Sequence, residues 1–120
     1  PGELIDKITI LEIKAERITD PAKLKNVQHE LDILTKAQRE GMQDSEELRK
    51  LWQELKAINE SLWVIEDDIR DCEAKKDFGE QFIQLARAVY ITNDKRAAVK
   101  KQINTLTGSA IVEEKSYKEF

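Results

Sequence analysis

The sequence predicts an all-α fold, an antiparallel bundle of four helices with a long C-terminal helical hairpin. Apolar residues recur at alternating gaps of three and four along most of the chain, which is the spacing of one helix face. Gly and Pro are few, at four and two residues, and aromatics make up only 6%, whereas a β-rich domain normally carries more of these. The expected helices span about residues 3–18, 21–40, 45–76 and 80–106. They form one domain, residues 1–108, followed by a short C-terminal tail, residues 109–120.

The first expected helix is apolar on more than one side. Its main stripe consists of Leu4, Ile8, Leu11, Ala15 and Ile18, and further apolar residues, Ile5, Ile10 and Ile13, lie off that stripe. Such a helix is either central in its bundle or buried against a second chain. We favour the dimer contact.

The segment Thr19-Asp20-Pro21 separates the first helix from the second. Asp20 can cap the second helix, and Pro21 occupies a first-turn position where its missing N–H costs nothing. The stripe of the second helix is Leu24, Val27, Leu31 and Leu34. Gly41 can supply the left-handed residue that ends this helix. His29 lies off the stripe, so we expect a solvated side chain.

The third expected helix, the longest, lies between Asp44 and Lys76. Its apolar stripe consists of Leu48, Leu51, Leu55, Ile58, Leu62, Ile65, Ile69 and Cys72. No Gly or Pro interrupts it, so we expect a rod of about 30 residues, roughly 45 Å long at ~1.5 Å per residue. Asp44 and Glu47 form a capping-box pattern at its start. A rod with such a stripe is not stable alone in water and needs other helices along it.

Asp77-Phe78-Gly79 predicts the turn into the fourth helix. The same three letters occur in protein kinases, but the chain has no Gly-rich loop or HRD segment, so we interpret them as turn chemistry. The stripe of the fourth helix is polar in its middle: Leu85, Val89, Thr92, Arg96, Val99, Ile103 and Leu106. Gly108 ends the helix. The charged tail contains an apolar segment, residues 110–112, that is able to dock on the bundle.

Composition and charge exclude several classes of function. The net charge of −4 argues against general binding to nucleic acid or to an anionic membrane, because counterion release needs a basic surface. One Cys, Cys72, allows no intrachain disulfide, and one Cys with one His makes a zinc site within one chain unexpected. No apolar run approaches the ~18 residues of a membrane span and no signal peptide is visible, so we expect a cytoplasmic protein. A start at Pro1 instead of Met is consistent with upstream residues having been removed or omitted.

Several segments together resemble a known protein family. They are GELIDKITILEIK (residues 2–14), DFG (77–79), LAR (85–87), VY (89–90), TNDKRAA (92–98) and IVEEKSY (111–117). This pattern is similar to a group of small bacterial and phage proteins catalogued as a domain of unknown function. The likeness covers nearly the whole chain, more weakly between Gly41 and Leu51. It implies a helical fold and supplies no catalytic residue.

The polar middle of the fourth helix is the best candidate for a site. Asn93, Arg96 and Lys100 lie on or beside the stripe that must face the bundle, next to Tyr90 and Thr92. Burying a guanidinium without a partner costs several kcal/mol or more, so a partner for Arg96 is expected.

Three interpretations of Arg96 stay open. If the third and fourth helices form a hairpin, Arg96 lies opposite Asn59 and Glu60, and we favour a pair with one of these or with an acid of the first helix. In the second, Lys7 and Lys14, which flank the first helix's stripe, join Arg96 and Lys100 in a pocket for an anionic metabolite or phosphate. In the third, Arg96 simply reaches solvent.

The second candidate is an acidic run in the third helix, made up of Glu66, Asp67, Asp68 and Asp71. All-α nucleotide pyrophosphohydrolases hold Mg²⁺ with carboxylates spaced three or four apart on facing helices. The candidate ligands here are Glu12, Glu16, Asp68 and Asp71. Of the four acids of the run, only Asp68 lies near the apolar stripe. Other acids of the run form ordinary i,i+4 ion pairs along the helix, such as Asp71–Lys75. We therefore favour a charged face in contact with solvent over a metal site.

For function, we expect an interaction or scaffold protein that self-associates as a homodimer. The long hairpin should extend beyond the two shorter helices and leave apolar stripe uncovered. A seven-residue row on the third helix, typical of a coiled-coil flank, fits a second subunit: Trp52, Asn59, Glu66 and Glu73. The alternative is a small all-α enzyme or binder of an anionic metabolite or nucleotide, similar to a Mg-dependent hydrolase, that uses Arg96 and Lys100. We find no catalytic signature, and expect no cofactor, membrane or nucleic-acid partner.

Overall fold

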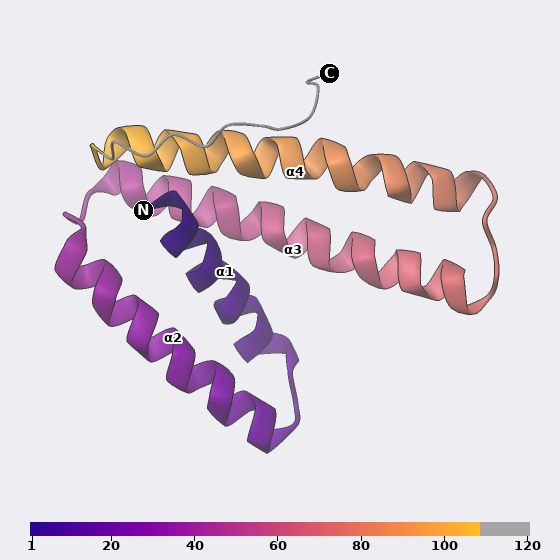
Figure 1. The fold of residues 1–120 in the computed structure, drawn as a ribbon, viewed down its shortest axis with the longest axis horizontal. Coiled ribbons are helices and arrows are strands. Elements are labelled where there is room, and N and C mark those ends of the chain that lie inside the picture. Colours follow the sequence, from indigo (N-terminus) through magenta and orange to yellow (C-terminus); the bar gives the residue numbers. More distant parts are fainter. Residues whose placement is uncertain (109–120) are drawn as a thin grey trace.

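The computed structural model describes residues 1–108, which fold into four helices. They are α1 (Gly2–Arg17), α2 (Pro21–Gly41), α3 (Glu46–Ala74) and α4 (Glu80–Leu106) (Figure 1). The predicted all-α class is confirmed, and the described range contains no strand. Each helix ends within two residues of its expected boundary. The predicted tail and its apolar segment lie outside the described residues.

The four helices are arranged as two hairpins joined through α1. α3 and α4 form the long hairpin, and α1 crosses its open end and contacts both helices (Figure 1). Among the described helices, α2 contacts only α1. The molecule measures 47 × 41 × 23 Å with a radius of gyration of 16.2 Å, whereas a compact domain of this length has about 13 Å. The fold is therefore flat, about two helix diameters thick at ~10 Å each.

The position of α1 explains why it is apolar on two sides. Ile5 and Ile8 are fully buried, and Ile13 is 1% exposed. Because helices of the same chain bury Ile5 and Ile13, the dimer contact that we favoured is not needed to cover them. The alternative, a helix central in its own fold, is confirmed.

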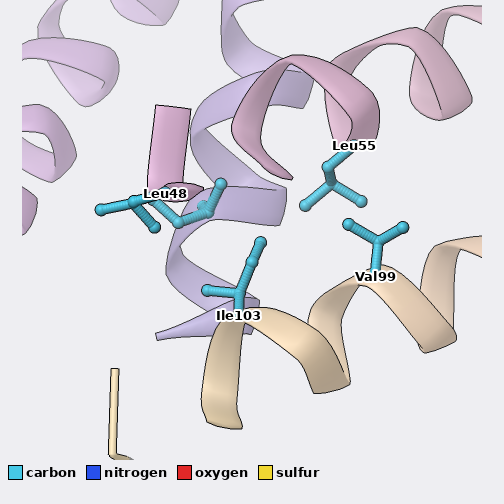
Figure 2. Packing of buried hydrophobic residues seen from close by; sticks show 5 residues of the cluster. Leu48, Leu55, Val99 and Ile103 are labelled. Atoms are coloured by element: carbon cyan, nitrogen blue, oxygen red, sulfur yellow. The ribbon is translucent and has the colours of Figure 1, made fainter. Parts of the chain in front are cut away.

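The hydrophobic core lies at the open end of the α3–α4 hairpin. Leu48 and Leu55 of α3 point toward Val99 and Ile103 of α4 (Figure 2), and Ile5 of α1 completes the cluster. Each of these five side chains is at most 3% exposed. At ~1.5–3 kcal/mol for each large apolar side chain, their burial is a main source of stability at this end. The four hairpin residues all belong to the predicted stripes.

The helix ends follow the predicted signals in part. Asp20 accepts a hydrogen bond from the backbone N–H of Ala22 at 3.0 Å, and Pro21 opens α2 as expected. The predicted role of Gly41 is wrong: it is the last residue of α2, and the extended Met42 follows it. Gly108, with φ of 72°, ends α4 as predicted. Within residues 1–108, no helix is long and apolar enough to cross a bilayer.

The start of α3 differs from the predicted capping box. Ser45 caps the helix, and its Oγ accepts a hydrogen bond from the backbone N–H of Leu48 at 3.0 Å. Asp44 instead lies 3.7 Å from Arg49 in an exposed ion pair. The reason is the boundary: since α3 begins at Glu46, the cap position falls one residue later than expected.

Alanine substitutions at Ser45 and at Asp44 test which of the two residues caps α3. Ser45→Ala is expected to lower the free energy of unfolding by about 1 kcal/mol, because the N–H of Leu48 loses its partner. Asp44→Ala is expected to cost less than about 0.5 kcal/mol, since exposed ion pairs contribute little. Urea denaturation followed by circular dichroism measures both. A larger loss for Asp44→Ala than for Ser45→Ala would support the predicted capping box, with Asp44 as the cap.

Candidate functional site

Four polar side chains from three helices meet beside the core. Asp6 and Thr9 come from α1, Asn59 from α3 and Arg96 from α4, and we call them the polar cluster. Asp6 is 2% exposed, Thr9 is fully buried and Asn59 is 5% exposed. The cluster therefore places a carboxylate and part of a guanidinium in a dry interior.

The carboxylate of Asp6 is the centre of the polar cluster. Arg96 donates to it twice, from Nε to Oδ1 at 2.8 Å and from Nη2 to Oδ2 at 2.5 Å. Asn59 Nδ2 donates to Asp6 Oδ1 at 3.0 Å and to Thr9 Oγ1 at 2.9 Å, and the Thr9 hydroxyl donates to the backbone carbonyl of Asp6 at 2.8 Å. The two-point contact with Arg96 is directional as well as strong. These bonds fix the register of α1 against both helices of the hairpin.

The favoured prediction for Arg96 is confirmed, with Asp6 as the acid of the first helix. Neither Asp6 nor Thr9 is among the candidate site residues that the sequence predicts. A signal was present, since Asp6 lies between Ile5 and Ile8 in a helix that is apolar on two sides. A charged residue in such a position needs a partner when the helix is central.

The N-terminus of α1 is fixed on α4 by two further contacts. The backbone N–H of Gly2 donates to Asn104 Oδ1 at 2.7 Å, and Lys100 Nζ forms an ion pair with Glu3. A Cβ on Gly2 would lie 2.5 Å from the backbone carbonyl oxygen of Lys100. Only a glycine allows α1 to approach α4 this closely.

A groove of 510 Å³ runs along α4 next to these contacts. The residues that line it are Val89, Tyr90, Asn93, Arg96, Ala97 and Lys100. Four predicted anion-binding residues therefore lie together: Tyr90, Asn93, Arg96 and Lys100. Lys7, which is exposed, and Lys14, which is half-buried, are not among the groove residues. Because carboxylates of α1 already hold Arg96 and Lys100, an anion in this groove would compete with Asp6 and Glu3.

The four candidate metal ligands are spread over different surroundings. Glu12 accepts a hydrogen bond from Trp52 Nε1 at 2.9 Å, and Glu16 pairs with Lys56 at 2.6 Å. The hydrogen bond to Glu16 raises the pKa of Lys56 above its ordinary value. Asp71 pairs with Lys75 at 3.0 Å, and Asp68 is exposed. Among residues 1–108, no three His, Cys, Asp or Glu side chains come together as a metal site.

The predicted seven-residue row on α3 faces α1 at two of its positions. Trp52 bonds to Glu12, and the buried Asn59 bonds to Asp6 and Thr9. The expectation that Trp52 and Asn59 meet a second subunit is therefore wrong, because a helix of the same chain occupies that side of α3.

The fold and the polar cluster define a small all-helical protein whose central helix is fixed to a helical hairpin by a buried Asp–Arg pair. The chain belongs to a family of unknown function, DUF6165, whose model matches residues 1–119. No curated protein and no solved structure matches the chain significantly. The predicted resemblance to a domain of unknown function is confirmed at this level. The origin in bacteria or phages stays a prediction.

Proposed function

We propose that this protein is a self-associating helical interaction protein, and that its contact surface is the distal half of the α3–α4 hairpin, residues 64–91. The observation that carries the proposal is a set of large apolar side chains exposed there. They are Val64 (48% exposed), Phe78 (51%), Ile83 (49%), Tyr90 (41%) and Ile91 (44%). Two of them, Ile83 and Tyr90, are seven residues apart in α4, and exposed apolar side chains that share one face of a helix are typical of protein–protein contact sites.

Among the described residues, the distal half consists of two helices only. The side-chain contacts of α1 fall on the other half, from Trp52 to Trp63 of α3 and from Arg96 to Asn104 of α4. Figure 1 shows α1 and α2 leaving the hairpin at its open end, with α3 and α4 alone at the closed end. Two paired helices bury only the stripe between them, so a second copy supplies the missing layer.

One side of α4 is the best surface for this contact. Ile83 and Tyr90 are seven residues apart and so lie on one side of the helix. Two further steps of seven lead to Ala97 and Asn104, and Asn104 bonds to Gly2 of α1. Ile83 and Tyr90 thus continue the side of α4 on which α1 packs. A symmetric dimer that pairs this surface with its own copy buries both residues.

The alternative function, binding or hydrolysis of an anionic metabolite or nucleotide through Arg96 and Lys100, has weaker support. Both cations have carboxylate partners within the chain, whereas the large apolar side chains of the distal half are 41–51% exposed. A rise in melting temperature with a nucleotide and Mg²⁺ that Lys100→Ala abolishes would favour the alternative.

Ile83→Lys is expected to weaken the dimer at least about tenfold, because a charge replaces an apolar side chain whose burial contributes ~1.5–3 kcal/mol. Sedimentation equilibrium over a range of concentrations measures the dissociation constant. The helical content by circular dichroism should not change, since Ile83 is half exposed in the single chain.

A matched variant on α2 locates the contact. Ile33→Lys places the same charge outside the distal half, where Ile33 is 53% exposed. It is expected to change the dissociation constant by no more than about twofold. A wild-type protein that sediments as a monomer, or a dimer that Ile33→Lys disrupts and Ile83→Lys does not, contradicts the proposal.

A further inference from the structure

A second, larger hollow lies on the other side of α1. It has a volume of 790 Å³, within the range of ~300–1,000 Å³ of small-molecule sites. Its lining comes from α1, α2, the α2–α3 connection and the first turns of α3: Glu12, Leu31, Asp32, Thr35, Lys36, Gln38, Arg39, Met42, Asp44, Leu48, Arg49 and Trp52. It shares no residue with the groove on α4. We call it the α2–α3 cavity.

Gln38 is the unusual residue of this cavity. It is the one buried residue of α2, at 7% exposed, and it is polar. Its side-chain amide makes no hydrogen bond to another residue of the described part of the chain, although it borders the cavity. Since no buried side-chain nitrogen or oxygen among residues 1–108 lacks a hydrogen-bond partner, the Gln38 amide reaches solvent in the cavity. Its donor and its acceptor are therefore available to a ligand there.

Trp52 is the aromatic residue that lines this cavity, and it also packs against the core. Its indole N–H donates to Glu12 at 2.9 Å, which restrains the ring before any ligand arrives. Leu31, Met42 and Leu48 add aliphatic surface around it. An aromatic side chain at a cavity suits a planar ring.

Equal numbers of acidic and basic residues line the cavity, but the acids and the bases differ in whether they have partners within the chain. Three acids and three cations line it. Each acid is engaged: Glu12 by Trp52, Asp32 by Gln28 at 2.8 Å, and Asp44 by Arg49 at 3.7 Å.

Two of the cations are not engaged in this way. Lys36 and Arg39, both on α2, make no ion pair with any acid among residues 1–108. Lys36 and Arg39 are therefore the charged side chains of the cavity that are available to bind an anionic group of a ligand.

We propose that the α2–α3 cavity binds a small organic anion, a flat ring joined to a phosphate or carboxylate group. The ring lies against Trp52, and its polar edge exchanges hydrogen bonds with the amide of Gln38, which offers both a donor and an acceptor. Lys36 and Arg39 hold the anionic group. This binding site is separate from the proposed dimer contact, so either can fail without the other.

Fluorescence of Trp52 tests the proposal directly. The chain has two tryptophans, and Trp63→Phe leaves Trp52 as the single reporter. Adenosine 5′-monophosphate, benzoate and inorganic phosphate are titrated separately. Adenosine 5′-monophosphate or benzoate is expected to change the emission saturably and raise the melting temperature. Because the two probes differ in both the ring and the anionic group, a response to either one supports the proposal. No response to either, or an equal response to phosphate alone, overturns the proposal.

Substitutions of the cations provide a matched comparison. Lys36→Gln with Arg39→Gln is expected to weaken binding of the responding probe roughly tenfold or more. Lys23→Gln with Lys25→Gln removes the same charge from exposed positions of α2 outside the cavity and is expected to change affinity less than about twofold. Equal effects of the two pairs overturn the assignment of Lys36 and Arg39.

A substitution of Gln38 tests whether its side-chain amide binds a ligand or stabilises the fold. Gln38→Met keeps the length of the side chain and removes the amide. If the amide serves a ligand, this variant loses affinity while its melting temperature without ligand stays equal or rises. A fall in melting temperature without ligand overturns the role assigned to Gln38.

Discussion

Arg96→Ala is expected to lower the free energy of unfolding by about 3–5 kcal/mol, the usual cost of removing one partner of a buried ion pair. Asp6, whose side chain is 3% exposed, would keep the hydrogen bond from Asn59 and lose both bonds from the guanidinium. The loss is large because a carboxylate buried in the native fold is left without its charged partner. Urea denaturation followed by circular dichroism measures it.

Two controls show whether the pair itself is responsible. Arg87→Ala removes an exposed arginine from the same helix and is expected to change stability by less than about 0.5 kcal/mol. Replacing Asp6 and Arg96 together by leucine is expected to cost less than Arg96→Ala alone, because no uncompensated charge remains inside. If Arg96→Ala is as stable as Arg87→Ala, the pair does not hold α1 in place.

Gly2→Ala is expected to destabilise the protein by about 1–3 kcal/mol, the typical cost of forcing an extra group into a packed contact. The added Cβ would lie 2.5 Å from the carbonyl oxygen of Lys100 and 2.9 Å from Asn104 Oδ1. The carbonyl belongs to the backbone of α4 and cannot rotate away, so α1 must shift, which weakens the bond from Gly2 to Asn104. Thermal and urea unfolding measure the loss.

The same substitution elsewhere provides the control. Gly41 has open space around it, with nothing within 4 Å of an added Cβ, and it is the last helical residue of α2. Gly41→Ala is therefore expected to raise stability by about 0.4–1 kcal/mol through the unfolded state. A stabilising effect of both substitutions would show that α1 does not approach α4 closely at Gly2.

Hydrophobic spacing predicted the helices well because it depends only on the chain itself. It did not predict which helix covers which stripe. The two-sided pattern around Ile5 and Ile13 fits a central helix and a dimer contact equally, and only the contacts of α1 with the other three helices decide between them. An apolar stripe indicates that one face of a helix is buried, but it does not indicate which other helix or chain covers that face.

The residues that cap a helix depend on where the helix begins and ends, and hydrophobic spacing does not define these ends to the residue. Asp44 and Ser45 are adjacent residues with similar capping ability, and a shift of one position at the start of α3 selects Ser45. Gly41 was misjudged for the same reason, since α2 continues through it.

The candidate sites were predictable to different degrees. Tyr90, Asn93, Arg96 and Lys100 share a groove because their spacing places them on one side of a single helix. The buried Gln38 gave no signal, because its burial comes from the position of α2 against α1 and not from any local pattern.

The contacts of α1 also have a consequence for biosynthesis. Asp6 and Arg96 are 90 residues apart in the chain, and Gly2 and Asn104 are 102 apart. A ribosome makes the N-terminal end first, so α1 emerges before α2, α3 and α4, the three helices that cover it. Its contacts with Arg96 and Asn104 form only after α4 has been synthesised, so they are among the last tertiary contacts to form during biosynthesis.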